Sequence, residues 1–296
     1  MTAKRLDNRG SIDRSKIISF NWDGKKYFGY KGDTLSSALL ANNIKIVGRS
    51  FKYHRPRGIM SAGVEESGAL VTIGNDDYSD PNVRATTQEL YEGLIAKGQN
   101  AFPNVNFDLY ALNNFFGRFF SAGFYYKTFM GIPPFEWGSG TKIWMIFEKL
   151  IRNAAGMGKA SRKPDPDKYE HAHDFCDVLV VGSGPSGIAA AIELANLKLD
   201  VILVEQDSKL GGSYLSESNK DINQDIAKLE NSKVRIMKRT TASGLYDHGV
   251  VGLLERVTDH QSIPSIHDPR QRFWTVRTNS IILATETVIG LLRVDQ

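Results

Sequence analysis

Three glycines between residues 177 and 205 have a spacing typical of dinucleotide-binding sites. The stretch reads DVLVVGSGPSGIAAAIELANLKLDVILVE, and Gly182, Gly184 and Gly187 fill the pattern Gly-x-Gly-x-x-Gly. The first glycine of this pattern allows a tight turn, the second lets the backbone approach a pyrophosphate, and the third lets a helix pack closely on a strand. The helix N-terminus then faces the phosphates. We therefore predict a nucleotide-binding turn, in which Ser186 is also a binding residue.

The surroundings of the glycines make the match specific. They follow an apolar strand and precede an Ala-rich helix, in which Ala191 is a small residue four positions past Gly187. Glu205 ends the next apolar strand, 18 residues past Gly187. A carboxylate at this position accepts hydrogen bonds from ribose hydroxyls and repels a 2′-phosphate, so NADP is disfavoured. A purely structural glycine turn is the lesser alternative in this context.

Residues beyond the acid extend the predicted site. Gln206 follows directly, and Gly211, Gly212 and Ser213 lie in KLGGSY, where backbone N–H groups could approach a phosphate or a ribose. The stretch KVRIMKRTTASG predicts a third strand that leaves Ala242 near the adenine end of the site. The alternating stretches after it predict a strand meander inserted in the nucleotide domain. These residues alone leave NAD and FAD open as the cofactor.

The sequence contains no recognisable catalytic or metal-binding constellation. Its single cysteine, Cys176, excludes an internal disulfide framework and a cysteine-ligated iron–sulfur cluster, and begins an apolar strand in which buried packing is expected. His171 and His173 lie in a polar stretch, predicted to be a linker, without a third ligand nearby. His54 and His248 are isolated, and we predict structural roles for both.

The N-terminal residues predict a small unit of mixed strands and helix. Residues 17–30 are expected to form two strands joined by an Asp23-Gly24 turn. Asp33 is expected to cap a helix over residues 34–43, and residues 44–48 and 69–74 are expected to be further strands. This order indicates an α+β unit.

Length and composition set broader limits. The chain has 296 residues, enough for two domains, with 41% hydrophobic residues and a net charge of +4. A charge this small does not argue for nucleic acid as a partner. No apolar run reaches about 18 residues, so no membrane span is expected. The first sixteen residues are charged and are followed by no apolar stretch, so no secretory signal is expected and a cytoplasmic location is predicted.

Three regions follow from these patterns. Residues 1–102 form the first domain, residues 103–174 an aromatic-rich connection and linker, and residues 175–296 the dinucleotide-binding domain. Residues 107–137 hold 12 of the 30 aromatic residues. Local core packing is the favoured interpretation of this segment, and a docking surface for a partner is the alternative, because aromatics are enriched at interface centres.

The basic loop GRSFKYHRPRG at residues 48–58 has three interpretations. It could be a solvated loop, or a scaffold loop that packs on the nucleotide domain or on a partner. A nucleic-acid patch is the least favoured, because Phe51 and Tyr53 offer few stacking surfaces and no recognised RNA motif surrounds them.

Several of these motifs carry a family resemblance that covers nearly the whole chain. The motifs are GDTLSSALLANN, VGRSFKYHRPRGI, AGFYYKTFMG, DVLVVGSGPSGIAAA, RTTASGLYD and ERVTDH. The chain resembles the N-terminal part of the α subunits of heterotetrameric sarcosine oxidases. The resemblance implies a ferredoxin-like β-grasp domain followed by a Rossmann-type domain. Residues 58–69 lie where related proteins carry cluster cysteines, and none stands there, so no iron–sulfur cluster is expected.

The resemblance also implies an activity and partners. Such enzymes oxidise sarcosine with oxygen and tetrahydrofolate to glycine, hydrogen peroxide and methylenetetrahydrofolate. FAD lies on the β subunit, FMN lies at the α–β boundary, and NAD is bound by the α subunit. The expected partners are therefore the β subunit and further small subunits, and the isolated chain is expected to be inactive. A non-catalytic dinucleotide-binding scaffold and an FAD-dependent oxidoreductase of another amine remain alternatives.

The end of the chain departs from the family pattern. The family's Ala-Thr-Gly is here Ala284-Thr285-Glu286, and a carboxylate in place of that glycine would crowd a dinucleotide. The sequence stops at Gln296, before the folate-binding aminomethyltransferase-like domain of the family. We therefore expect an incomplete nucleotide domain.

Overall fold

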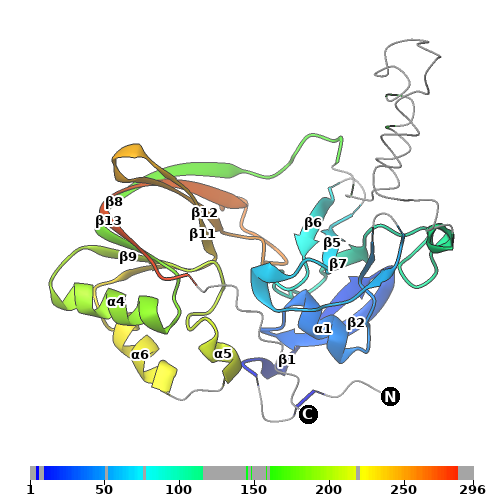
Figure 1. The fold of residues 1–296 in the computed structure, drawn as a ribbon, viewed down its shortest axis with the longest axis horizontal. Coiled ribbons are helices and arrows are strands. Elements are labelled where there is room, and N and C mark those ends of the chain that lie inside the picture. The colour runs from blue at the N-terminus through cyan, green and yellow to red at the C-terminus, as the bar shows by residue number, and fades with distance from the viewer. Residues whose placement is uncertain are drawn as a thin grey trace. The chain divides into compact units, whose positions relative to one another are not determined.

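The computed structural model describes most of the chain as two units. The described residues are 5–6, 10–50, 53–75, 78–115, 145, 148, 158, 161–217 and 221–285. Most contacts lie within one of two units, and the boundary between the two units falls between Asp165 and Pro166. Each unit has its own buried core. Figure 1 shows the strands and helices of both units.

The first unit contains a five-stranded mixed sheet. Its strands, in spatial order, are β2 (Lys25–Lys31), β1 (Asp13–Trp22), β7 (Ile95–Gly98), β5 (Leu70–Ile73) and β6 (Asp80–Arg84). Strands β1 and β7 run parallel, and the other neighbours are antiparallel. Phe20 and Trp22 point from β1 into a single core that also holds Leu35 and Leu39 of helix α1 (Leu35–Ala41).

The predicted hairpin at the start of this sheet is confirmed. Trp22 pairs with Lys25, so that Asp23 and Gly24 alone make the turn. Both residues have positive φ, 47° and 79°, as a two-residue turn matched to the strand twist requires. The Asp-Gly dipeptide therefore sets the register of β1 against β2.

The predicted cap of helix α1 is wrong by one residue. Thr34 is the N-cap: its hydroxyl accepts a hydrogen bond from the Ser37 backbone N–H, and the Ser37 hydroxyl oxygen accepts one from the Thr34 backbone N–H. Thr34 has the extended backbone that a cap requires. The predicted cap, Asp33, instead accepts from the Ser37 hydroxyl at 2.7 Å.

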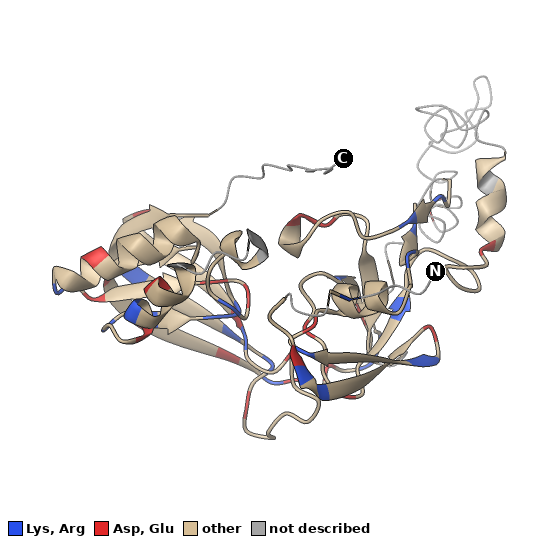
Figure 2. Ribbon diagram, turned by 90° about the horizontal axis from the view of Figure 1, so that it is seen from below, with Lys and Arg blue, Asp and Glu red and all other residues tan. Residues whose placement is uncertain are grey.

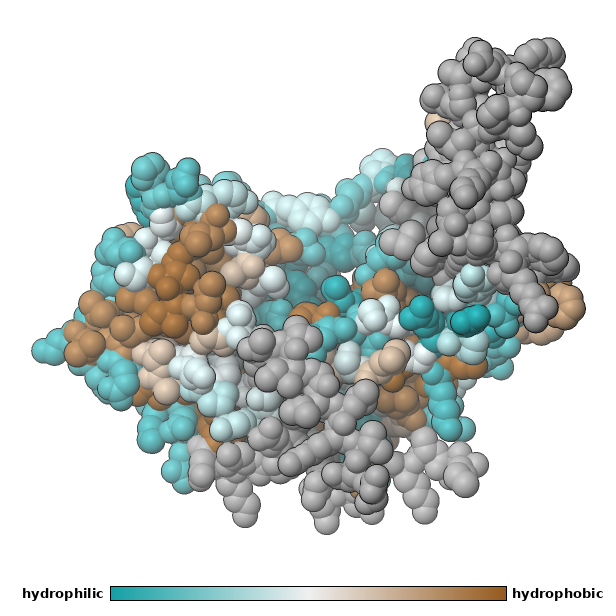
Figure 3. Space-filling model, in the orientation of Figure 1, coloured by the Kyte–Doolittle hydropathy of each residue, from teal (hydrophilic) through white to brown (hydrophobic). Residues whose placement is uncertain are grey.

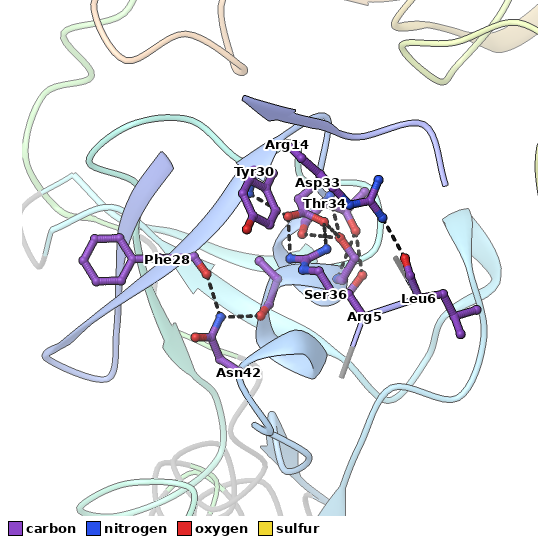
Figure 4. Close-up of polar contacts among 11 residues, drawn as sticks. Arg5, Leu6, Arg14, Phe28, Tyr30, Asp33, Thr34, Ser36 and Asn42 are labelled. Atoms are coloured by element: carbon purple, nitrogen blue, oxygen red, sulfur yellow. Dashed lines mark hydrogen bonds and ion pairs between the residues drawn. The ribbon is translucent and has the colours of Figure 1, made fainter. Parts of the chain in front are cut away.

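Asp33 lies at the centre of a buried polar cluster (Figure 4). Its carboxylate accepts from Arg5 Nη1 at 2.8 Å, from Arg5 Nη2 at 2.6 Å and from the Tyr30 backbone N–H at 2.8 Å. The Arg5 guanidinium also lies over the Tyr30 ring, 5.2 Å from its centroid. The carboxylate thus joins the residues before β1 to the end of β2 and to the start of α1.

The strand predicted at residues 44–48 is largely absent. Ile44 donates its N–H back to Leu39 of the preceding helix, whereas the Val47 N–H donates to the Arg57 carbonyl oxygen. A two-residue strand, β3 (Gly48–Arg49), pairs with β4 (Pro56–Arg57). The described part of the unit also contains two 3₁₀ turns, η1 (Gly63–Glu65) and η2 (Leu109–Asn114).

The second unit contains a six-stranded sheet. Its spatial order is β10 (Arg235–Met237), β9 (Val201–Val204), β8 (Tyr169–Val181), β13 (Gln271–Leu283), β12 (Val250–Arg256) and β11 (Thr240–Tyr246). The first four strands are mutually parallel, and β12 and β11 continue the sheet antiparallel. The predicted meander is confirmed as β11–β12–β13, and a further 3₁₀ turn, η4 (Asp247–Gly249), lies between its first two strands.

The two faces of this sheet have separate cores. Val178 and Val180 of β8 point toward helices α4 (Pro185–Asn196) and α6 (Asp221–Glu230), which lie side by side in Figure 1. Leu179 and Val181 point to the opposite face, as the period of two in a strand dictates. A strand buried on both faces explains the continuous apolar run DVLVV. The short helix α5 (Tyr214–Glu217) precedes α6.

Two further predictions about this unit are corrected. The single strand predicted from KVRIMKRTTASG is two strands, β10 and β11, because Arg239 has a positive φ of 55° and turns the chain between them. His171 and His173 lie within β8 rather than in a linker, and His171 Nε2 is 3.0 Å from the Thr275 hydroxyl on β13.

We predict that Asp33→Ala destabilises the first unit by about 3 kcal/mol, because a buried ion pair loses one partner and leaves the other partner's charge uncompensated. Urea unfolding of the purified chain measures this. Asp13→Ala is the control: the Asp13 side chain is partly exposed and bonds to its neighbour Ser15, so the midpoint should hardly move. Equal effects of the two substitutions would contradict the role given to Asp33.

Candidate functional site

The glycine turn lies between the C-terminal end of β8 and the N-terminus of α4. Gly182 has a φ of 101°, and a Cβ on it would lie 2.6 Å from the Ala284 carbonyl oxygen. A Cβ on Gly187 would lie 1.9 Å from the Gly182 carbonyl oxygen. The fold itself therefore requires glycine at both positions, one for the turn and one for the approach of helix to strand.

Gly184 differs from its two neighbours in the motif. Its φ of −64° and ψ of 175° are open to any residue, and an added Cβ would meet no atom within 4 Å. It is the N-cap of α4, and no side chain caps the helix. The described fold thus gives no reason for glycine here, whereas the motif predicts that a phosphate approaches the backbone at this position. The open space fits that ligand.

Glu205 lies against the glycine turn, with 7% of its surface exposed. Its Oε2 accepts hydrogen bonds from the Ser183 backbone N–H at 2.9 Å and from the Ser183 hydroxyl at 2.5 Å. Its Oε1 accepts from the Asp207 N–H at 2.9 Å. A carboxylate has about four acceptor positions, so these three bonds leave capacity for one further donor such as a ribose hydroxyl.

The second glycine pair closes on the same turn. The Gly211 N–H donates to the Ser183 carbonyl oxygen at 3.0 Å, and Gly211 and Gly212 both have positive φ. The Thr240 N–H donates to the Glu205 carbonyl oxygen at 2.8 Å, which brings the start of β11 beside the acid. The structure therefore gathers the glycine turn, Glu205 and Gly211 at one end of the parallel strands.

The remaining predicted residues lie around this centre in different ways. Ser186 and Ser213 are exposed, and the Gln206 carbonyl oxygen accepts from the Arg256 guanidinium at 2.7 Å. Ala242 packs against the buried cluster that contains Val204. Their contacts to a nucleotide stay predictions.

Sequence reasoning missed Ser183, which links Glu205 to Gly211. Ser183 is fully buried and occupies a variable position of the glycine pattern, so the motif itself carries no signal for it. Cys176, by contrast, is buried as predicted, and burial raises the pKa of its thiol. Such a thiol is poorly suited to act as a nucleophile.

The basic loop of the first unit bonds within its own unit. His54 Nδ1 lies 2.8 Å from Asp108 Oδ2, and both side chains are buried. Arg49 donates to the carbonyl oxygens of Val105 and His54, and Arg55 donates to the Asn114 side chain. His54 therefore has a structural partner, which the sequence reasoning did not identify.

Charged residues of both signs occur in the described part of each unit (Figure 2). Figure 2 shows Lys and Arg interspersed with Asp and Glu along the ribbon. Among the described residues, no group of three or more His, Cys, Asp or Glu side chains could hold a metal ion. No helix in the described part of the chain has the length and apolar character needed to cross a membrane.

Most of the aromatic segment falls outside the described residues, which stop at Phe115 and next include Met145. Within the described part, Phe107 and Phe115 are exposed. Glu286 and the residues after it also lie outside the described part. The expectations for both stretches stay predictions.

Two family models match the chain. Residues 15–101 match the 2Fe-2S iron-sulfur cluster binding domain, and residues 177–275 match the FAD dependent oxidoreductase family. The first match covers the sheet of the first unit, and the second begins at the strand that leads into the glycine turn.

The predicted resemblance to sarcosine oxidase α subunits is confirmed. The chain is 46% identical to sarcosine oxidase subunit alpha of Rhizobium meliloti (strain 1021) over 96% of its own length and 29% of that protein. It is 31% identical to sarcosine oxidase subunit alpha of Corynebacterium sp. (strain P-1), over 93% of the chain and 24% of that relative. The chain thus spans less than a third of the length of these relatives.

A solved structure shares the fold. L-proline dehydrogenase from P. horikoshii superposes with a TM-score of 0.53 at 19% identity, covering 95% of this chain and 42% of that one. The chain also matches dihydrolipoyl dehydrogenase of Buchnera aphidicola subsp. Schizaphis graminum (strain Sg), at 33% identity over 27% of this chain and 22% of that protein.

We predict unequal effects on stability for two glycines of the same turn. Gly187→Ala should destabilise the second unit by about 2 kcal/mol, because its Cβ overlaps backbone that must shift. Gly184→Ala should change stability by no more than about 0.5 kcal/mol, because its Cβ meets nothing. Chemical denaturation of both variants measures the difference. A loss at Gly184 as large as that at Gly187 would show that the space at Gly184 is not open.

Proposed function

We propose that the chain is the dinucleotide-binding part of an α subunit in a multi-subunit flavoenzyme that oxidises sarcosine. The 46% identity to a sarcosine oxidase subunit alpha supports the family of enzyme. The open space at Gly184, at the uncapped N-terminus of α4, is the single observation that carries the binding role. This proposal treats the second unit as Rossmann-type, which the parallel order β10-β9-β8 supports.

The chain's own residues would hold the ADP half of the dinucleotide. The first-turn backbone N–H groups of α4 would bind the pyrophosphate, and the remaining acceptor capacity of Glu205 would bind a ribose hydroxyl. The same carboxylate would repel the 2′-phosphate of NADP. We propose NAD as the ligand. FAD is the alternative, and the match to the FAD dependent oxidoreductase family supports that alternative. Either dinucleotide supplies hydride-transfer chemistry when bound.

The amine site belongs, in this proposal, to another subunit. This chain spans 29% and 24% of the length of the two sarcosine oxidase relatives, so most of each relative lies outside the matched part. We propose that the partners are a β subunit with FAD and FMN and further small subunits, and that tetrahydrofolate receives the methylene group.

The surface of the second unit is consistent with a larger assembly. Figure 3 shows apolar surface gathered over this unit. Its exposed large apolar side chains include Tyr169, Phe175, Leu197, Leu245, Tyr246 and Phe273. Extended apolar surface of this kind is typical of proteins that are covered by further polypeptide. A non-catalytic dinucleotide-binding scaffold would share this surface and is the alternative to an enzyme subunit.

We predict that Gly184→Ala weakens NAD binding about tenfold or more, because the new Cβ occupies the space left for the pyrophosphate. Calorimetric titration with NAD, and then with FAD, measures this. Glu193→Ala, which changes an exposed acid on the same helix, is the control and should bind like the parent chain. A stable Gly184→Ala variant that binds both dinucleotides with unchanged affinity would remove the basis for this site.

We predict that the chain alone makes no hydrogen peroxide from sarcosine, because the proposal assigns the amine site to another subunit. A peroxidase-coupled assay with added FAD and sarcosine tests this. Activity should require a co-expressed β subunit. Peroxide formed by the chain alone would contradict the proposal that the amine site lies on another subunit.

A further inference from the structure

The first unit matches a cluster-binding family but offers no ligands for a cluster. The match covers residues 15–101, and the one cysteine of the chain, Cys176, lies outside it. Iron–sulfur clusters are held by cysteine thiolates, and their sulfurs accept hydrogen bonds from nearby groups. The residues of this unit therefore do not fit a [2Fe–2S] cluster. Another group must hold the loop between β4 and β5 in place.

That loop closes around a buried carboxylate. Glu66 is 1% exposed. Its Oε2 accepts from the Met60 N–H at 2.6 Å and from the Ser61 N–H at 2.8 Å. Its Oε1 accepts from the Gly68 N–H at 2.5 Å. Backbone donors from both sides of the loop thus converge on one anion.

The glycines of the loop allow this close approach. A Cβ on Gly58 would lie 2.7 Å from the Lys45 carbonyl oxygen, and one on Gly68 would lie 2.8 Å from the Gly58 carbonyl oxygen. The same Cβ on Gly68 would lie 3.0 Å from Glu66 Oε1. Outside the loop, the Thr86 hydroxyl donates to the Gly63 carbonyl oxygen. The backbone is therefore packed tightly around the carboxylate rather than left open for a ligand.

The carboxylate is held in its charged form. Burial alone would raise the pKa of Glu66, but hydrogen bonds from the N–H groups of Ser61, Met60, Gly68 and Ala69 lower the pKa below its usual value. These donors all favour the anion. A neutral carboxyl would turn one acceptor into a donor facing other donors.

We propose that the Glu66 carboxylate replaces the cluster as the anion around which this loop folds, so that the domain keeps its shape without iron or redox activity. The negative charge that cysteine-bound sulfur would bring is supplied by a side chain of the loop itself. The loop therefore needs no metal loading to form, and electron transfer through this unit is absent.

Site-resolved amide hydrogen exchange with the full chain tests the proposal. Glu66→Gln keeps the size of the side chain but removes the charge and points an amide donor at other donors. The N–H groups of Met60, Ser61 and Gly68 should exchange about tenfold faster or more, the factor that corresponds to one hydrogen bond of about 1.4 kcal/mol. Glu65→Gln, the exposed neighbour, is the control and should leave all three unchanged. Unchanged protection in Glu66→Gln would overturn the proposal.

Two measurements on the unaltered chain remain decisive if Glu66→Gln does not fold. Because the folded pKa is lowered, the stability from Glu66 is complete above the unfolded value of about 4.3 and is lost as pH falls through the lower folded value. Protection of the three amides relative to free peptide should therefore persist at pH 5 and fall on further acidification.

Reconstitution with iron and sulfide should leave the chain free of both. Stoichiometric iron and acid-labile sulfide bound to the first unit would overturn the proposal.

Discussion

The hydrogen bonds between Glu205 and Ser183 join the two halves of the candidate nucleotide site. They link the end of β9 to the glycine turn after β8, and Gly211 then bonds to the same serine. Two neighbouring parallel strands end here, and the α4 N-terminus faces the same point. A dinucleotide at this position would be met by backbone donors on one side and by a carboxylate on the other. Without this link, the glycine turn and the ribose-binding acid would not be held in one geometry.

Buried carboxylates have a related structural role in the first unit. Asp33 joins the residues before β1 to helix α1, Glu66 gathers the loop before β5, and Asp108 bonds to His54. Each of these carboxylates accepts hydrogen bonds from at least two other residues. Buried charges are tolerated where several donors satisfy them. Hydrogen bonds to buried carboxylates therefore hold together the parts of this unit in which short strands and loops form few backbone hydrogen bonds.

Local signals made part of this architecture predictable. The Asp-Gly turn, the apolar run of β8 and the strand–turn–helix arrangement around the glycine motif each depend on adjacent residues, and all three are found as predicted. The Ser183–Glu205 and His54–Asp108 contacts were not predictable, because their partners are 22 and 54 residues apart and neither pair belongs to a periodic pattern. The Thr34 cap was missed because Asp33 and Thr34 are both good cap residues, and only the backbone geometry distinguishes them.

The central claim is that the turn at Gly182–Gly187 holds an adenine dinucleotide. The most direct test is to denature the purified chain, separate the released small molecules by chromatography and identify them, before and after incubation with NAD and with FAD. The account predicts that one of these dinucleotides is retained through desalting and released on denaturation, with NAD expected. Failure to retain either one, in a chain shown to be folded, would contradict it.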